Sequence, residues 1–428
     1  MTQPPSHNAT PLTAQAPWGG PLGKRELVVM LACCFGLNAL AIDTMLPALD
    51  DIAAHYNLAH ANQQQWVVFS YILGFGVPQL FAGPLSDRIG RKIILRVSFI
   101  FYVLFGFACM FTPTFEALLA ARLLQGVSAA GIRVTATSIV RDLFEGRAMA
   151  RTMSLILTIF MVIPIIGPSV GQLVLWVTDW RWTFGILGLF GFFIWVWLEL
   201  RLPETLAPDA RRSLRPQIIA SGYWTIITTP VTIGYILASG IMFGALFSFI
   251  GSSEQIFSDV FDQEAFFALW FAAIAGALTI ANFTNSRIVE RFGMRRISHA
   301  ALCLFIITSA LNMGLCHIYG ARLIFFFPLF SISFGCFGMI GANFSALAME
   351  PLGKLAGTGA AAYGFSTSTL SSLIGLFLAA RFDGTLGPLL FGNILIGLCA
   401  LILVLITEKG RLFRDGSAER AAKRAQTR

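Results

Sequence analysis

A single carboxyl group stands deep within an apolar segment of this chain. Asp43 is the only charged residue between Leu27 and Leu49, a run of 23 residues. Burying an unpaired charge is costly, so such a residue is retained because it pairs with a cation or serves a polar pathway. Counted from Leu49, Asp43 lies six residues deep, roughly 9 Å along a helix. Pro47 cannot donate to the Asp43 carbonyl, so the helix is expected to weaken beside the acid.

Two arginines in another apolar segment are candidate partners for this carboxyl. Arg122 and Arg133 are eleven residues apart, about three helical turns, so they share one helix face. Arg122 lies at about the depth of Asp43, and Arg133 lies roughly 16 Å further along the helix. An ion pair between Asp43 and Arg122 that only holds two helices together is one interpretation. Arg133 either binds substrate or positions its helix, and the sequence leaves both open.

Other polar residues within apolar segments line a cavity or make contacts between helices. They are Asn38, Tyr71, Gln79 and Asn343. Other chemistries lack their signals: the five histidines have no metal-ligand spacing, the seven cysteines form no CxxC pair, and no Walker, GxSxG or HExxH motif occurs. We therefore expect no metal and no cofactor, and a membrane enzyme or sensor is the weaker class of interpretation.

The elements that carry these residues are apolar runs of about 20 residues, the length that crosses a bilayer as a helix. The chain is 56% hydrophobic and 12% charged, whereas about a quarter of a soluble domain is charged. The alternation of a transmembrane barrel is absent. We predict an all-α membrane protein with twelve transmembrane helices, near 27–49, 63–84, 93–112, 117–140, 152–177, 183–200, 228–252, 264–284, 297–316, 322–347, 355–380 and 385–407.

The positions of the basic residues predict the orientation. With the N-terminus inside, the predicted cytoplasmic segments contain 25 of the 30 Lys and Arg residues, as the positive-inside rule requires. The opposite side is acidic, with Asp50, Asp51, Asp179, Asp259, Asp262, Glu264 and Asp383. We therefore expect both termini in the cytoplasm. The net charge of +8 follows from this bias, and a nucleic-acid partner is not needed to explain it.

The longest internal polar segment, RLPETLAPDARRSLRPQ, divides the twelve runs into two sets of six. We predict a leader at 1–25, a six-helix bundle at 26–200, a cytoplasmic linker at 201–227, a second six-helix bundle at 228–407 and a basic cytoplasmic tail at 408–428. A motif repeated at an offset of 203 residues supports a duplication. In it, Asp87, Arg88, Gly90 and Lys92 correspond to Glu290, Arg291, Gly293 and Arg295.

The first copy of this motif carries a resemblance to a known family. GPLSDRIGRK is similar to the G-x-x-x-D-R-x-G-R-K signature of the major facilitator superfamily, through Gly83, Asp87, Arg88, Gly90, Arg91 and Lys92. Gly83 is expected to let two helices approach closely, and Gly90 to permit a tight turn. The charged residues are expected to form a lock with neighbouring helix ends that stabilises one orientation of the two halves.

Further motifs extend the resemblance over most of the chain. ARLLQGVSAAG resembles the family's fourth-helix signature, and GPSVG resembles, with Gly167, Pro168 and Gly171, the fifth-helix element of proton-driven exporters. DWRWTF and LPETL resemble the bounds of the sixth helix, and AIDTMLPAL and VRDLF resemble the Bcr/CflA group of drug/proton antiporters. Ile163 and Gln172 stand where glycines are usual, which leaves the packing of the fifth helix open.

The resemblance implies a monomeric antiporter of the cell inner membrane that exports small organic compounds, drugs or antibiotics among them, by rocking of two bundles. It places Asp43 and Arg122 at proton-coupling positions, with the proton gradient as the energy source. The expected partners are protons, a small-molecule substrate and the lipid bilayer. The alternative is an exporter of an amino-acid-like or anionic metabolite, and an importer of this fold is disfavoured by Gly167, Pro168 and Gly171. A carboxyl whose solvation and distance from Arg122 change during rocking loads a proton on one side and releases it on the other.

Overall fold

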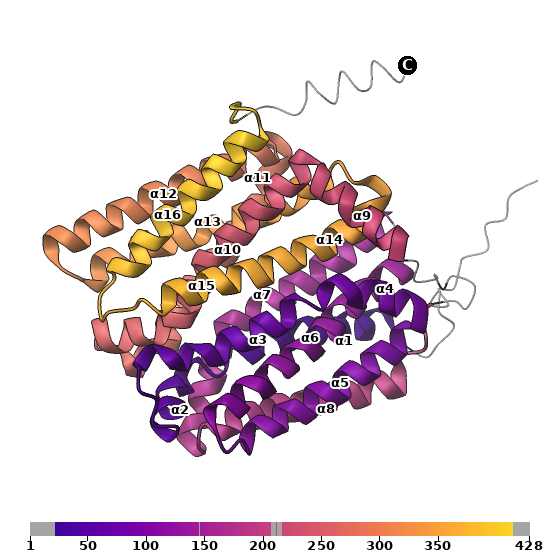
Figure 1. The fold of residues 1–428 in the computed structure, drawn as a ribbon, viewed down its shortest axis with the longest axis horizontal. Coiled ribbons are helices and arrows are strands. Elements are labelled where there is room, and N and C mark those ends of the chain that lie inside the picture. Colours follow the sequence, from indigo (N-terminus) through magenta and orange to yellow (C-terminus); the bar gives the residue numbers. More distant parts are fainter. Residues whose placement is uncertain (1–21, 145, 207–210, 212–215, 414–428) are drawn as a thin grey trace, which may run out of the picture.

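The chain forms two helical bundles that lie side by side (Figure 1). The computed structural model describes residues 22–144, 146–206, 211 and 216–413. Within these residues, 11 helices are long and apolar enough to cross a membrane, and one bent pair of helices makes a twelfth span. The prediction of twelve transmembrane helices is therefore confirmed.

The N-terminal bundle contains six spans, two of which are interrupted. The first span comprises α1 (Lys24–Asp43), the 3₁₀ turn η1 (Leu46–Ala48) and α2 (Leu49–His55), and the 3₁₀ turn η2 (Ala61–Gln65) follows. The second span is α3 (Trp66–Gly76) with α4 (Gln79–Ile89), bent by 45°. The other four are α5 (Arg91–Met110), α6 (Phe115–Leu143), α7 (Gly146–Val177) and α8 (Arg181–Arg201).

The C-terminal bundle follows a short helix, α9 (Pro216–Thr228), that lies within the segment expected to be only a linker. Its spans are α10 (Pro230–Gln255) with the π-helical turn η4 (Ile256–Val260), α11 (Phe267–Phe292) after the 3₁₀ turn η5 (Glu264–Phe266), α12 (Met294–Tyr319) and α13 (Leu323–Met349). After the 3₁₀ turn η6 (Gly353–Leu355), the eleventh span comprises α14 (Ala356–Phe365), the π-helical turn η7 (Ser366–Leu370) and α15 (Ser371–Ala379). The last span is α16 (Gly387–Thr407).

The bundles meet along two seams. On one, α3 and α4 pack against α14, η7 and α15, and Figure 1 shows these helices along the border between the indigo and orange parts. On the other, α7 packs against α11. We call the side on which α1 begins and α16 ends the terminal side. The other, where α2 and η4 end, is called the opposite side. Helix α9 lies on the terminal side (Figure 1).

Candidate transport site and conformational loop

Asp43 is the last residue of α1, and the first span breaks directly after it. The Thr44 amide donates to the Leu40 carbonyl at 3.0 Å, and the chain then turns into η1, which contains Pro47. This is the interruption that Pro47 predicts. Because α2 continues to His55, the span is Lys24–His55, and Asp43 lies near its middle. The acid is thus deeper than the six residues expected, and it is only 4% exposed.

Helix α7 contacts the break through the two glycines of its GPxxG element. Gly167, Pro168 and Gly171 are all buried. A Cβ atom at Gly167 would lie 2.6 Å from the Asp43 Cβ, and one at Gly171 would overlap the Thr44 carbonyl oxygen. These glycines are therefore required by a close helix approach. The element that resembles proton-driven exporters lies directly against the candidate proton site.

Arg122 caps the end of α1, and it does not pair with Asp43. Its guanidinium donates to the Ala41 carbonyl at 2.8 Å, to the Gln125 Oε1 at 2.8 Å and to the Val67 carbonyl at 3.3 Å. The last carbonyls of a helix lack partners within it, and a cation there is favoured by the helix dipole. Arg122 is fully buried. Among the described residues, the predicted ion pair between Asp43 and Arg122 is absent from this conformation.

Asn38 and Tyr71 join the same group. The Tyr71 hydroxyl donates to the Asn38 Oδ1 at 2.9 Å, and the Arg122 guanidinium lies 4.5 Å from the Tyr71 ring centroid. The structure thus connects α1, α3 and α6 around the residue that precedes the break. Of the predicted site residues it brings together Asn38, Tyr71 and Arg122, whereas Asp43 contacts Gly167 of α7.

Arg133 lies between two aromatic rings. Its guanidinium is 5.1 Å from the Phe35 ring centroid on α1 and 5.5 Å from the Phe160 ring centroid on α7. Such cation–π contacts hold a guanidinium in an apolar setting. The side chain remains partly exposed, so this position is compatible with both roles left open for it, substrate binding and helix positioning.

The structure places the other two polar candidates away from Asp43. The Gln79 amide donates to the Gly364 carbonyl at 3.3 Å and to the Ser368 hydroxyl at 3.0 Å, so it joins α4 to the C-terminal bundle. The Asn343 amide donates to the Asn285 Oδ1 at 2.8 Å within the C-terminal bundle. Both make contacts between helices, and Asp43 is not among their partners.

Ile163 and Gln172 depart from the glycines usual in the fifth helix, and the structure explains the departure at Ile163. Ile163 packs onto Gly36 of α1, where any Cβ would overlap the isoleucine side chain. The small residue at this crossing is therefore on α1 in place of α7. At the other position, the Gln172 amide points to the Ala265 carbonyl of the C-terminal bundle at 3.5 Å.

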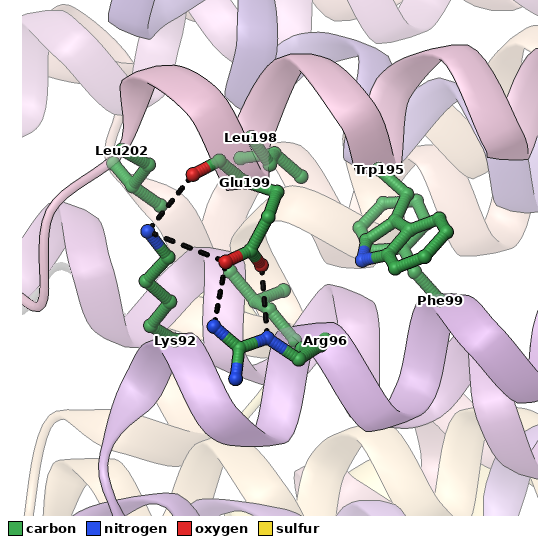
Figure 2. A pocket seen from close by; sticks show the side chains of 8 residues that line it. Lys92, Arg96, Phe99, Trp195, Leu198, Glu199 and Leu202 are labelled. Carbon is green, nitrogen blue, oxygen red and sulfur yellow. Dashed lines mark hydrogen bonds and ion pairs between the residues drawn. The ribbon is translucent and has the colours of Figure 1, made fainter.

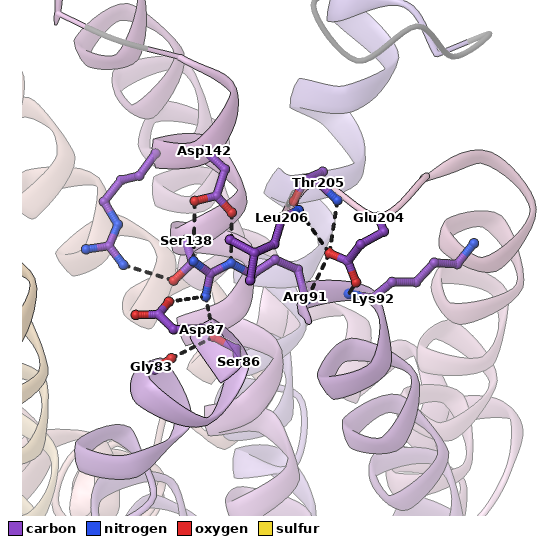
Figure 3. A network of polar contacts seen from close by, with 11 residues as sticks. Gly83, Ser86, Asp87, Arg91, Lys92, Ser138, Asp142, Glu204, Thr205 and Leu206 are labelled. Carbon is purple, nitrogen blue, oxygen red and sulfur yellow. Dashed lines mark hydrogen bonds and ion pairs between the residues drawn. The ribbon is translucent and has the colours of Figure 1, made fainter. Parts of the chain in front are cut away.

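The signature loop forms a charge network on the terminal side (Figure 3). The Arg91 guanidinium contacts the Asp87 carboxylate at 2.5 Å, the Asp142 carboxylate at 2.8 Å and the Ser86 hydroxyl at 2.6 Å. Asp142 belongs to the VRDLF motif at the end of α6. The expected lock between the loop and a neighbouring helix end thus exists within the N-terminal bundle. Arg88 is exposed and takes part in none of the described ion pairs.

Glu204, from the LPETL motif, caps the start of α5 (Figure 3). Its carboxylate accepts from the Arg91 amide at 3.0 Å and from the Lys92 amide at 3.2 Å. A carboxylate at a helix N-terminus satisfies free N–H groups and is favoured by the dipole. Gly90, with φ of +119°, makes the turn between α4 and α5, as expected. A Cβ at Gly83 would make only an ordinary 3.8 Å contact with Val134, so the close approach expected there is not observed.

A second ionic contact ties α5 to α8 (Figure 2). The Glu199 carboxylate accepts from the Arg96 guanidinium at 2.5 and 3.0 Å, and the Lys92 ammonium donates to the Glu199 carbonyl at 2.9 Å. Phe99 and Trp195 line the same small pocket beside this pair. Together with the Glu204 cap, these contacts fix the end of α8 to the signature loop.

The C-terminal bundle repeats this arrangement, as the predicted duplication requires. Gly293, with φ of +83°, makes the turn between α11 and α12, as Gly90 does between α4 and α5. The Arg295 guanidinium contacts Glu408 at 2.8 Å and Glu350 at 3.5 Å. Each half therefore has a cation after its glycine turn that binds acids at neighbouring helix ends.

A tyrosine of α9 crosses to the N-terminal bundle. The Tyr223 hydroxyl donates to the Leu80 carbonyl of α4 at 2.8 Å. Pro84 has no N–H to offer the carbonyl four residues before it, so this oxygen lacks its helical partner. Burial raises the pKa of Tyr223 to about 12, and the phenol therefore stays protonated and able to donate at neutral pH. Gly222 packs on Thr358 of α14, so α9 bridges both bundles.

On the opposite side, the bundles are joined by amides and an aromatic side chain. The Gln65 amide donates to the Gln255 Oε1 at 2.5 Å, and the Asn62 amide donates to the Phe382 carbonyl at 2.8 Å. The Phe69 ring is fully buried and fits where Gly251 lacks a side chain. In this conformation, the opposite side is therefore closed near α3 and α10.

Sequence reasoning missed one buried acid at this seam. Glu254 follows the predicted seventh span, 228–252, but the observed span extends through η4 to Val260, and Glu254 is only 5% exposed. Its burial depends on contact with the other bundle, about 200 residues away in sequence, and no local pattern indicates it. In the described part of the chain, no group of three or more His, Cys, Asp or Glu side chains that could hold a metal ion is found.

Two bundles of six apolar helices, with a buried carboxyl at a broken helix, define a multi-pass α-helical membrane protein built for transport. Residues 31–376 match the model of the Major Facilitator Superfamily. The chain belongs to this family, and it is a transporter and not an enzyme.

Similar curated proteins carry names from drug resistance. The chain is 27% identical to Multidrug resistance protein D of Escherichia coli, over 88% of this chain and 95% of that protein. It is 27% identical to the Bicyclomycin resistance protein homolog of Haemophilus influenzae, over 86% and 92%. These names agree with the Bcr/CflA group. Among solved structures, the xylose transporter XylE from E. coli has the same fold, with a TM-score of 0.67, 13% identity and coverage of 88% and 96%.

Proposed function

We propose that this transporter is a proton-coupled antiporter that exports small organic, drug-like compounds across the cell inner membrane. In this proposal both termini face the cytoplasm, so the terminal side is cytoplasmic and the opposite side is external. The names of the similar proteins support export of drugs. The basic residues of the loops support the orientation.

The observation that carries the proposal is the setting of Asp43. Its carboxyl is buried at a helix break, beside the glycines of α7, and has no ion-pair or hydrogen-bond partner among the described residues. A buried carboxylate without a partner is costly, whereas a protonated carboxyl is not. Arg122 is held by the Ala41 carbonyl, two residues before Asp43. A small movement of α6 against α1 therefore changes the distance between the cation and the acid.

This arrangement links proton binding to conformation. When Arg122 approaches Asp43 or water reaches the carboxyl, the ionised form is favoured, and when both withdraw, the protonated form is favoured. Rocking of the bundles that exposes the break first to one side and then to the other would then load and release one proton per cycle. Movement of the α7 glycines against the break couples this exchange to the opening of the seam between α7 and α11.

The test is uphill transport by the Asp43→Asn variant. A toxicity panel comparing cells that express the parent protein or Asp43→Asn first identifies a substrate. Proteoliposomes with a pH gradient then measure accumulation against the substrate gradient, and vesicles without a pH gradient measure downhill exchange. We expect Asp43→Asn to lose accumulation and to keep exchange. Asp51→Asn, an exposed acid of α2, is the matched control and should keep both.

Two results would contradict the proposal. Uphill, proton-coupled transport by Asp43→Asn at nearly the parent rate would remove Asp43 as the carrier. Absence of substrate-stimulated proton movement in the parent, across chemically diverse compounds, would remove proton coupling altogether.

A further inference from the structure

Two carboxyl groups, one from each bundle, face each other on the opposite side. Asp50 is in the first turn of α2, and Glu254 is near the end of α10. The consecutive amides of Gln64 and Gln65 join the two acids: Gln64 donates to Asp50 at 2.8 Å, and Gln65 donates at 2.5 Å to Gln255, the residue after Glu254. Helix α10 also packs on η1, the turn that precedes Asp50, and the two carboxyls act on each other electrostatically. Asp50 is exposed, whereas Glu254 is 5% exposed. This pair therefore spans the contact between the bundles.

Glu254 lacks a hydrogen-bond donor. Its Oε2 atom is buried and has no partner among the described residues. The neighbouring amides donate elsewhere: Gln64 to Asp50 at 2.8 Å, and Gln255 to Asn62 at 3.2 Å. An ionised carboxylate would thus be buried without compensation. A protonated carboxyl becomes a donor itself, and Asp50 is the acceptor beside it.

The charges around Glu254 are all of one sign. Asp50 from α2, Asp259 from η4 and Glu264 from η5 act on it, and all three are acidic. Further titratable groups on this side include Asp51 and His55 of α2, Asp262 and Asp383 in the loops, and His60, which lines a cavity of about 370 Å³ together with Asp259. Arg381 lies over the Phe377 ring at 3.6 Å and forms none of the described ion pairs.

We propose that Asp50 and Glu254 form a proton-binding site, separate from Asp43, that holds the opposite side of the transporter closed. With one proton bound, the Glu254 carboxyl donates to the Asp50 carboxylate and links the bundles. Without it, two carboxylates in contact repel each other across the seam. Loss of the proton therefore favours separation of α2 from α10.

The proton of this site comes from the solution on the opposite side and returns there. Asp50 is exposed to that solution while the seam is closed, and opening exposes Glu254 as well. The site therefore controls one conformational step and carries no proton across the membrane. Because closing takes up one proton, the ratio of closed to open molecules rises by up to about tenfold for each pH unit of acidification.

The experiment measures the distance across the opposite side as a function of pH. Spin labels are attached to Ala54→Cys and Thr385→Cys, two exposed positions in different bundles, in a cysteine-free background of the full-length protein. Distances are recorded by double electron–electron resonance between pH 5 and pH 9, without substrate and without a proton gradient. The response of the parent is compared with Glu254→Gln, Asp50→Asn, Asp51→Asn and Asp43→Asn.

The parent should shift from short to long distances as the pH rises. Glu254→Gln should stay at the short distance at every pH, because the glutamine amide donates to Asp50 permanently. Asp50→Asn should also lose the pH response, and it keeps the test valid where Glu254→Gln does not fold. Asp51→Asn, with the same charge change one residue away, should respond like the parent.

Asp43→Asn separates this proposal from the proposed transport mechanism. It should lose uphill transport and keep the pH-dependent distance change. A distance distribution that does not change with pH in the parent, or a Glu254→Gln variant that responds like the parent, would overturn the proposal. So would closure driven at fixed pH by potassium or tetramethylammonium, since the ligand would then be a cation other than the proton.

Discussion

The contact between Gly167 and Asp43 determines how closely α7 approaches the break in α1. A Cβ atom added at Gly167 would lie 2.6 Å from the Asp43 Cβ, whereas an ordinary contact is at least 3.4 Å. The shortfall is about 0.8 Å, and both atoms are attached directly to helix backbones. Gly167→Ala therefore requires α7 to move away from α1, or the Asp43 side chain to shift.

The expected losses of stability and of transport rate follow from the size of this overlap. Overpacking of a close helix contact costs about 1–3 kcal/mol of stability. A displacement of nearly 1 Å at a reacting group lowers rates by up to about 100-fold. We therefore expect the Gly167→Ala variant to lose between about 10-fold and 100-fold in uphill transport, with lower thermal stability in detergent.

The assay pairs the proteoliposome transport measurement with thermal unfolding of the same preparations. Gly276→Ala in α11 is the matched control, because no atom lies within 4 Å of the added Cβ. That variant should transport like the parent and should be at least as stable, since alanine favours a helix over glycine by about 1 kcal/mol. Parental transport and parental stability of Gly167→Ala would refute the argument that this contact positions Asp43.

Three further predictions concern parts of the molecule that move or bind. Asp87→Asn, which removes one of the carboxylates on Arg91, should slow turnover about tenfold and change substrate affinity less than fivefold in transport kinetics; a large affinity loss with normal turnover would contradict it. Arg133→Ala should change the substrate profile in a growth-inhibition panel, most for compounds with an anionic group, and an unchanged profile would show that Arg133 only positions its helix. Tyr223→Phe removes one hydrogen bond, to Leu80, worth about 1 kcal/mol. The ratio of open to closed molecules at the terminal side, measured from spin-label distances, should therefore rise about fivefold. An unchanged ratio would show that this bond does not hold the terminal side closed.

The spans and the helix break beside the acid were predictable because they depend on local sequence. An apolar run of about 20 residues has few alternatives to a membrane helix, and Pro47 removes a donor wherever the chain folds. The turn of the signature loop was predictable for the same reason, since its positive φ depends on Gly90 itself, whereas the acids that bind its charged residues come from distant helix ends.

The partners of these residues were harder to predict. Arg122 binds the Ala41 carbonyl, which becomes available only because α1 ends beside it. From the sequence, the natural partner of a buried arginine is a buried acid. The backbone carbonyls that a helix break leaves without partners cannot be recognised in this way. The burial of Glu254 likewise results from packing between bundles, which no run of neighbouring residues records.

The crossing of α1 and α7 at Gly36 and Ile163 has a consequence for comparing related sequences. A close helix crossing needs one small residue, and either helix can supply it. Here the glycine is on α1 and the bulky side chain on α7. The requirement therefore belongs to the pair of positions and not to either one. In related chains, a glycine at the α7 position should accompany a larger residue at the α1 position, so that the combined side-chain volume stays constant. A comparison of one position at a time would record these linked changes as two unrelated departures.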